Sequence, residues 1–224
     1  MESILPPKKS LITLKKSNVS YQQHLANFAK AFDVLVHRQS QYTVFDDFLS
    51  FALLMLKLEK KAEYFADLET RWKTPDEYRA FSEMLLHYCY ASRGEDGMGF
   101  VDPLGDFFME RMSNDRNGQF FTPMEVCLLM AQIQGNFQDG QTVNDCSCGS
   151  GRNLLAAGRF NRNLIFFGED IDLRCCKMTL LNMLSNSMQG RVAHKNTLSM
   201  QTWKTWEIVL VNTNRGLLPH YYEL

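Results

Sequence analysis

Residues 142–151 read Thr-Val-Asn-Asp-Cys-Ser-Cys-Gly-Ser-Gly, which is typical of a short strand followed by a turn that contains two glycines. A helical pattern begins at Arg152, so the turn joins a strand to a helix. In an open α/β sheet such a turn is a ligand site, because glycines let a ligand approach the backbone and the amides at the helix start point outward. The stretch therefore predicts an α/β fold with a binding site at this turn.

The spacing of the turn indicates the kind of ligand. Asp145 stands four residues before Gly149, and Gly151 follows two residues later, which differs from the GxGxxG spacing of dinucleotide sites. A pyrophosphate needs a longer run of free amides and tolerates no nearby carboxylate, whereas a ligand with an ammonium group suits Asp145. S-adenosylmethionine carries that ammonium. We therefore expect this cofactor to bind at Asp145, Cys146, Gly149 and Gly151.

A second acidic motif, Gly-Glu-Asp-Ile-Asp at residues 168–172, follows at the end of the next expected strand. A carboxylate at this place can accept both ribose hydroxyls, and the apolar residue after it can lie against adenine. We assign Asp170 to the ribose and Ile171 to the adenine. Alone, Asp170 or Asp172 would more often cap the following helix, but the glycine turn one strand earlier favours the binding role.

Strands and helices alternate in the second half of the chain. We expect strands at residues 142–145, 164–168, 191–194 and 207–211, with helices at 152–160 and 173–188 between them. Such alternation implies right-handed crossovers and a parallel sheet, here of about four strands. The last strand would lie at an edge with unpaired backbone groups, covered by the chain's own helices or by another chain.

The first half predicts an all-helical region. Apolar residues recur at three- and four-residue intervals, and Thr74 with Glu77 forms a capping box at one helix start. We divide the chain into a flexible basic arm at residues 1–19, a helical domain at 20–112 and a cofactor-binding domain at 113–224. The glycine-rich segment at residues 92–99 is the best hinge.

Composition excludes several classes of protein. The 224 residues carry a net charge of −1, whereas an autonomous nucleic-acid binder is usually basic. No apolar run reaches the roughly 20 residues of a membrane span, and no signal peptide is evident. The six cysteines show no CxxC spacing, so we expect reduced thiols, a cytoplasmic location and no metal site.

The motifs occur in the order of one known family. They are GQFFTP at residues 118–123, the turn at 145–151, GEDID at 168–172, Asn196-Thr-Leu, and a strand ending in Asn212. Over about residues 100–215 the chain resembles the modification subunits of type I restriction-modification systems, which are N6-adenine DNA methyltransferases. The resemblance implies a Rossmann-like, class I S-adenosylmethionine-dependent methyltransferase core preceded by a helical region.

The resemblance also implies roles for individual residues. Phe120, Phe121 and Thr122 would contact the methionine end of the cofactor, with the Thr122 hydroxyl on its carboxylate. Asn196 stands where the family usually has an aspartate that accepts a hydrogen bond from the adenine amino group, and an amide oxygen can accept the same bond. Asn212 would be the catalytic residue.

The last motif departs from the family. The family has Asn-Pro-Pro followed by an aromatic residue, whose acceptors and ring hold a flipped-out adenine, and this chain reads Asn-Thr-Asn-Arg at residues 212–215. An exocyclic adenine amine is a poor nucleophile and depends on such acceptors and stacking. Impaired methyl transfer is therefore expected. The family fold also continues for three more strands, yet twelve residues follow Asn212.

Three functions remain open. The first is an adenine methyltransferase, and the second is a non-catalytic scaffold or sensor that binds S-adenosylmethionine. The third is a methyltransferase whose acceptor is a small molecule or a protein. In the first two functions, the chain would contact DNA through a separate specificity or reader subunit. Association with further copies of the chain, as a homo-oligomer, is also possible.

Overall fold

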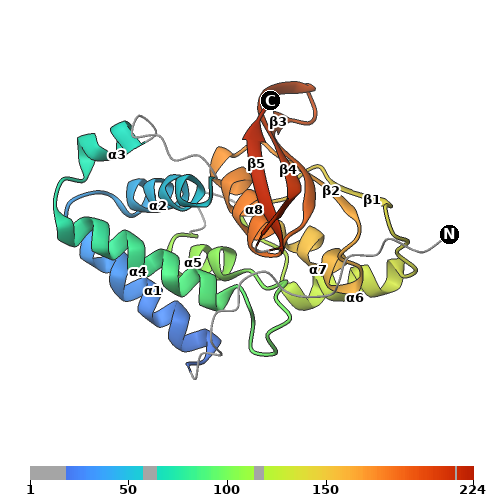
Figure 1. Cartoon of the computed structure of the whole chain (residues 1–224), viewed down its shortest axis with the longest axis horizontal. Helices are drawn as coiled ribbons and strands as arrows, with labels where there is room; N and C mark the ends of the chain where they lie inside the picture. The colour runs from blue at the N-terminus through green and yellow to red at the C-terminus, as the bar shows by residue number, and fades with distance from the viewer. Residues whose placement is uncertain (1–18, 58–64, 114–118, 215) are drawn as a thin grey trace.

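A computed structural model describes residues 19–57, 65–113, 119–214 and 216–224 (Figure 1). The expected basic arm at residues 1–19 lies outside this part of the chain except for Val19, and so does Gly118 of the GQFFTP stretch. The expected α/β class with a helical first half is confirmed, because the described residues up to Gln141 form helices and loops and every strand follows them.

Helices form where the sequence pattern places apolar stripes and caps. Ser20 accepts a hydrogen bond from the backbone N–H of Gln23, and the capping box of Thr74 and Glu77 is present as expected. The helices of this region are α1 (Tyr21–Val36), α2 (Gln41–Leu56), α3 (Ala66–Arg71), α4 (Pro75–Ala91), α5 (Pro103–Arg111) and α6 (Met124–Gln134). Helix α3 was not expected from the sequence.

The sheet has five strands in the order β1-β2-β3-β4-β5. They are β1 (Thr142–Asp145), β2 (Ile165–Asp170), β3 (Gln189–Asn196), β4 (Gln201–Thr213) and β5 (Gly216–Glu223). Strands β1, β2 and β3 are parallel, so their carboxyl ends meet at one edge of the sheet. This edge carries the glycine turn and the second acidic motif.

The expectation of a wholly parallel sheet of four strands is wrong beyond β3. Strand β4 runs antiparallel to β3, and β5 runs antiparallel to β4. Four residues, 197–200, separate β3 from β4, whereas a parallel crossover needs a dozen or more. The chain therefore turns back directly.

Both crossover helices cover the same face of the sheet. Helix α7 (Arg152–Phe160) joins β1 to β2, and α8 (Leu173–Ser185) joins β2 to β3. Two right-handed crossovers that step in the same direction lie on one face. One hydrophobic core includes buried residues of the N-terminal helices, of α8 and of this face, and Figure 1 shows α8 between the N-terminal helices and the sheet. It includes the buried strand residues Phe166, Val192, Trp206, Ile208 and Tyr221.

The glycine-rich segment at residues 92–99 is packed against the end of α8. Its three glycines have positive φ angles, as a turn requires, but the N–H of Phe100 donates to Asn186 Oδ1 at 2.7 Å. A Cβ on Gly99 would lie 2.5 Å from the same amide oxygen. The segment therefore joins the two halves by a close contact, while the expected domain division stays a prediction.

Two surfaces of the sheet layer have no cover within the described ranges. Strand β1 pairs with β2 on one side only, so among the described strands it is an edge, as is β5. Helix α6 exposes Val126, Leu129, Met130 and Ile133, which are spaced as one helical stripe. Strand β5, in contrast, touches the helical half, where Tyr221 donates its hydroxyl to the carbonyl of Leu53 at 2.9 Å. None of the described helices has the length and apolar character that crossing a membrane requires.

Candidate cofactor-binding site

The glycine turn lies at the carboxyl end of β1, directly before α7. Gly149 has φ +55° and Gly151 has φ +91°, a left-handed conformation that favours glycine. The N–H of Gly151 donates to the carbonyl of Cys148 at 2.7 Å, which closes the turn. The following helix begins at Arg152, so its first amides face the same space as the turn.

Asp170 joins this turn to the next strand. Its Oδ2 accepts from the N–H of Gly149 at 2.8 Å, and its Oδ1 accepts from the N–H of Asp172 at 2.8 Å. Each oxygen keeps a further lone pair for a ligand hydroxyl. Burial raises the pKa of Asp170, with the nearby carboxylates of Asp172 and Asp145 adding to the rise, while its two backbone hydrogen bonds oppose it. The structure thus brings Asp170 and the glycine turn together, as the spacing predicts.

Phe121 of the GQFFTP stretch lies against the glycine turn. A Cβ added to Gly149 would lie 2.9 Å from Phe121 Cδ1, so only glycine allows this approach. The Phe121 ring also packs on Phe108, with ring centroids 5.5 Å apart. Phe120 and Thr122, on either side, expose their side chains. The stretch therefore lines the turn from the helical side.

Asp145 ends β1 and is held by its own neighbours. Its Oδ1 accepts from the N–H of Ser147 at 3.1 Å, and its Oδ2 accepts from Asn153 Nδ2 at 2.9 Å. Among the described residues, the buried Oδ1 of Asn153 has no hydrogen-bond partner. A carboxylate beside an unpaired amide oxygen suits a ligand with several N–H donors, such as an ammonium group.

The remaining expected cofactor residues reach the same edge of the sheet. Ile171 is 61% exposed next to Asp170. Asn196 ends β3, but its Oδ1 accepts from the backbone N–H groups of Leu198 and Ser199, both at 3.1 Å, so it also closes the turn to β4. The carbonyl of Cys146 accepts from the Thr197 hydroxyl at 2.9 Å, which ties that turn to the glycine turn.

Asn212 is not brought to this site. Ile208 of β4 already lies opposite Gly190 near the start of β3, and Asn212 lies four residues further on, opposite Leu217 of β5. Because β4 is antiparallel, Asn212 lies beyond the amino ends of the parallel strands, at the edge opposite the glycine turn. The expectation that the Asn212 strand runs beside the cofactor strands in their own direction is corrected accordingly.

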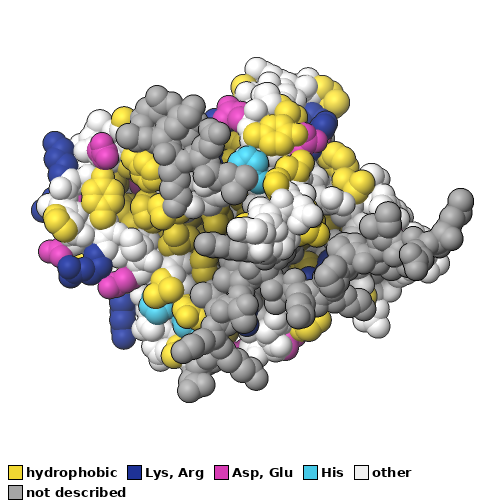
Figure 2. All heavy atoms as spheres, viewed as in Figure 1, with side chains coloured by type: hydrophobic (Ala, Val, Ile, Leu, Met, Phe, Trp, Pro, Cys, Tyr) yellow, Lys and Arg dark blue, Asp and Glu magenta, His cyan; other side chains and the backbone are white. Residues whose placement is uncertain are grey.

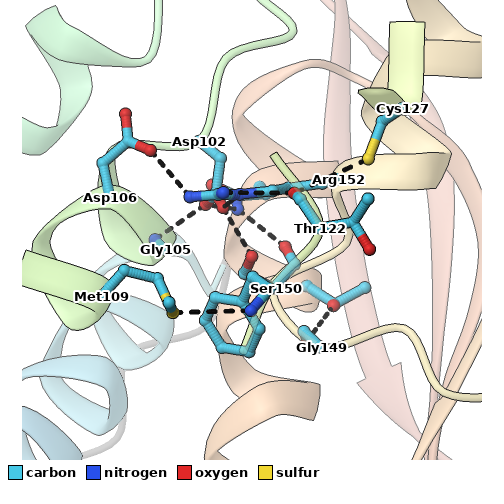
Figure 3. A network of polar contacts seen from close by, with 12 residues as sticks. Asp102, Gly105, Asp106, Met109, Thr122, Cys127, Gly149, Ser150 and Arg152 are labelled. Carbon is cyan, nitrogen blue, oxygen red and sulfur yellow. Dashed lines mark hydrogen bonds and ion pairs between the residues drawn. The ribbon is translucent and has the colours of Figure 1, made fainter. Parts of the chain in front are cut away.

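The sequence reasoning missed a buried polar group behind the turn. Asp102, Ser150, Arg152 and Asn182 are all buried, and the last three each donate a hydrogen bond to the Asp102 carboxylate. Figure 3 shows Ser150 and Arg152 on either side of Asp102. One signal was available, since an arginine at the first position of a helix opposes the helix dipole and needs an acidic partner.

A comparison of the chain with known protein families identifies its family. The model of the N-6 DNA methylase family matches residues 102–219, more than half of the chain. The chain belongs to the N-6 DNA methylase family. The family match includes the GQFFTP stretch, the glycine turn and the second acidic motif.

A solved structure supports the fold of this N-6 DNA methylase family member. It is the crystal structure of the type I restriction-modification system methyltransferase subunit from Streptococcus thermophilus, with a TM-score of 0.51 and 16% sequence identity. The similarity covers 80% of this chain and 60% of that chain, so the present chain matches only part of that subunit. No curated protein sequence matches the chain significantly.

Proposed function

We propose that the chain binds S-adenosylmethionine at the carboxyl edge of β1 and β2. The observation that carries the proposal is the Asp170 carboxylate, which bridges the amides of Gly149 and Asp172 and lies beside the exposed Ile171. In this proposal Asp170 accepts from the ribose hydroxyls, and Ile171 contacts the adenine. Asp145 and Asn153 face the ammonium group.

The residues around the turn complete the proposed cofactor site. Phe120, Phe121 and Thr122 lie at the methionine end, while Cys146 and Asn196 belong to the two turns that meet there. When bound, the cofactor supplies an electrophilic methyl group. The protein's own contribution is to hold the cofactor between the glycine turn and its GQFFTP stretch.

We propose that the chain is an adenine-N6 DNA methyltransferase-like component of a restriction-modification system whose methyl transfer is impaired. Two features support impairment: residues 212–215 lack the prolines and the aromatic residue of the family motif, and Asn212 lies at the sheet edge opposite the cofactor turn. The same features favour the second candidate, a scaffold or sensor that binds S-adenosylmethionine without catalysis.

DNA contact, in this proposal, needs a further subunit. The net charge of −1 gives no excess of cations for phosphate contacts. On the face drawn in Figure 2, most of the described Lys and Arg side chains lie at the left edge, over the helical half, and others lie at the upper right. The open edge of β1 and the apolar stripe on α6 offer surface to a second polypeptide, either another subunit or a second copy. The six free cysteines fit the expected cytoplasmic location.

Isothermal titration calorimetry with S-adenosylmethionine tests the cofactor proposal. We expect binding by the intact chain and a loss of about 1.5–3 kcal/mol in Asp170→Ala, the worth of hydrogen bonds to a charged group. Asp67→Ala, which removes an exposed carboxylate of α3, is the control and leaves the affinity unchanged. Absence of heat at millimolar cofactor would refute the proposal.

Transfer of labelled methyl to DNA tests the second part. We expect the isolated chain to transfer little or no methyl to adenine. Robust transfer by the unaltered chain would show that the family's prolines are dispensable here and that the impairment does not exist.

A further inference from the structure

A saturated buried carboxylate lies directly behind the glycine turn. The Asp102 side chain accepts four hydrogen bonds, and the residue is 2% exposed. Its Oδ1 accepts from the N–H of Gly105 at 2.9 Å and from Asn182 Nδ2 at 2.7 Å. Its Oδ2 accepts from Ser150 Oγ at 2.5 Å and from Arg152 Nε at 2.7 Å. A carboxylate has about four acceptor sites, so Asp102 has no capacity left for a ligand and acts on its neighbours.

Arg152 extends this group in three directions (Figure 3). Besides Asp102, it donates through Nη2 to Asp106 Oδ1 at 2.7 Å and through Nη1 to the carbonyl of Thr122 at 3.2 Å. Burial alone lowers the pKa of Arg152, but Asp102 and Asp106 raise it by more. A cation at the first position of α7 is opposed by the helix dipole, so these two carboxylates hold Arg152 in place.

The two segments of the proposed cofactor site both depend on this group. The glycine turn is held through Ser150, whose carbonyl also accepts from Asn182 Nδ2 at 2.9 Å. The GQFFTP stretch is held through the Thr122 carbonyl, and the Arg152 guanidinium lies 5.8 Å from the centroid of the Phe121 ring. A shift of Arg152 therefore moves both sides of the site.

The group also reaches the first helix of the chain. The Tyr21 hydroxyl, at the start of α1, donates to Asp106 Oδ2 at 2.6 Å. The Tyr21 backbone N–H donates to Glu95 Oε1 at 2.7 Å. Tyr21 itself contacts none of the proposed cofactor residues through any hydrogen bond observed in the described part of the chain. Its hydrogen-bonded connection to the site runs through Asp106 and Arg152.

We propose that Asp102, Asp106 and Arg152 are positioning residues through which docking of α1 by Tyr21 strengthens S-adenosylmethionine binding. The inference rests on the proposed function, since it concerns the same site. When the Tyr21 hydroxyl holds Asp106, the Arg152 guanidinium keeps its hydrogen bonds to Asp106, Asp102 and the Thr122 carbonyl. The glycine turn then stays in its binding conformation. Thermodynamic linkage requires the reverse as well, so the bound cofactor stabilises the docking of α1 by the same factor.

The test compares Tyr21→Phe with the intact chain. This change removes one hydroxyl and keeps the ring, so the fold is retained. We expect the dissociation constant for S-adenosylmethionine, measured by calorimetry, to rise about fivefold or more, the lower end of ordinary allosteric coupling. In hydrogen exchange, saturating cofactor slows the amides of α1 in the intact chain and slows them less in Tyr21→Phe.

Tyr78→Phe is the matched control. It removes a tyrosine hydroxyl that donates to the Trp72 carbonyl at 3.0 Å. This hydrogen bond lies inside the helical region and involves none of Asp102, Asp106 and Arg152. We expect its cofactor affinity to equal that of the intact chain. Asp106→Asn, which keeps an acceptor for Tyr21 but removes the charge facing Arg152, weakens binding at least as much as Tyr21→Phe.

Three results overturn this inference. Equal affinity and equal protection of α1 in Tyr21→Phe and the intact chain refute the coupling and leave the proposed function standing. An equal loss in Tyr78→Phe shows a general stability effect instead of a specific link. No binding by the intact chain refutes the proposed function, and this inference with it.

Discussion

Replacing Gly149 by alanine places a methyl group where the ring of Phe121 lies. The new Cβ would be 2.9 Å from Phe121 Cδ1 and 3.1 Å from Cε1, so the ring must move. The φ of +55° adds about 1–2 kcal/mol of strain for a residue other than glycine. Displacing Phe121 from Phe108 costs a further 0.5–1.5 kcal/mol or so. The free energy of unfolding therefore falls by about 1.5–3.5 kcal/mol.

Gly97→Ala separates strain from contact. Gly97 has φ +72° and nothing within 4 Å of an added Cβ, so this variant suffers strain alone. The two variants differ by the contact contribution of about 0.5–1.5 kcal/mol, so at roughly 2–4 °C per kcal/mol for a chain of this size Gly149→Ala melts about 1–6 °C lower than Gly97→Ala.

Cofactor affinity is the second measurement on this pair. We expect S-adenosylmethionine to bind Gly149→Ala about tenfold more weakly, or 1.4 kcal/mol, and Gly97→Ala as tightly as the intact chain. Equal melting temperatures for the two variants, together with unchanged affinity in Gly149→Ala, would refute the reasoning about the turn.

Further predictions concern pH and the far sheet edge. Because the pKa of Asp170 is raised, cofactor affinity measured by calorimetry falls as the pH drops towards that pKa, above the ordinary value near 3.9, and Asp170→Asn removes this dependence. The same raised pKa stabilises the fold at low pH, a contribution lost as the pH rises through it. Asn212→Ala leaves cofactor affinity unchanged, and a clear loss would place Asn212 in the site. Burial lowers the pKa of His24 and His87, whose Nδ1 atoms lie 3.0 Å apart, so the melting temperature falls as the pH drops below about 6.5, and less so in His87→Gln.

Local patterns predicted the helices other than α3, and the three parallel strands of the sheet. The capping box at Thr74 and the strand ending at Asp145 follow from chemistry within a few residues. The fifth strand was not expected, and its sequence contains Pro219, a residue that is disfavoured inside a sheet. In the structure Pro219 lies on an edge strand opposite Leu210, where a missing N–H is tolerated.

The direction of β4 depends on where β3 ends. Residues 191–194 and 207–211 leave enough chain between them for a crossover, but the strands extend to Asn196 and back to Gln201. Side-chain hydrogen bonds of Asn196 to the next two amides close that turn, and such a turn is not visible in hydrophobic periodicity.

The proposed cofactor residues at the carboxyl edge of the sheet were predictable from the sequence. The buried residues behind the glycine turn were not. Asp170 and Gly149 lie on successive strand ends, and parallel pairing brings such ends together. Asp102 lies 50 residues before Arg152 in the sequence, and only the tertiary fold brings the N-cap of α5 to the first residue of α7. Tyr21 is still more distant in sequence, so its contact with Asp106 required the full structure.

The most direct test of the account is a crystal structure of the chain grown with S-adenosylhomocysteine, the demethylated product. We predict ligand density at the glycine turn, with the ribose hydroxyls on the Asp170 carboxylate and the adenine against Ile171. Ligand density at another place, such as the groove lined by Leu129 and Phe160 on α6 and α7, would contradict the assignment. An empty glycine turn at saturating ligand would contradict it equally.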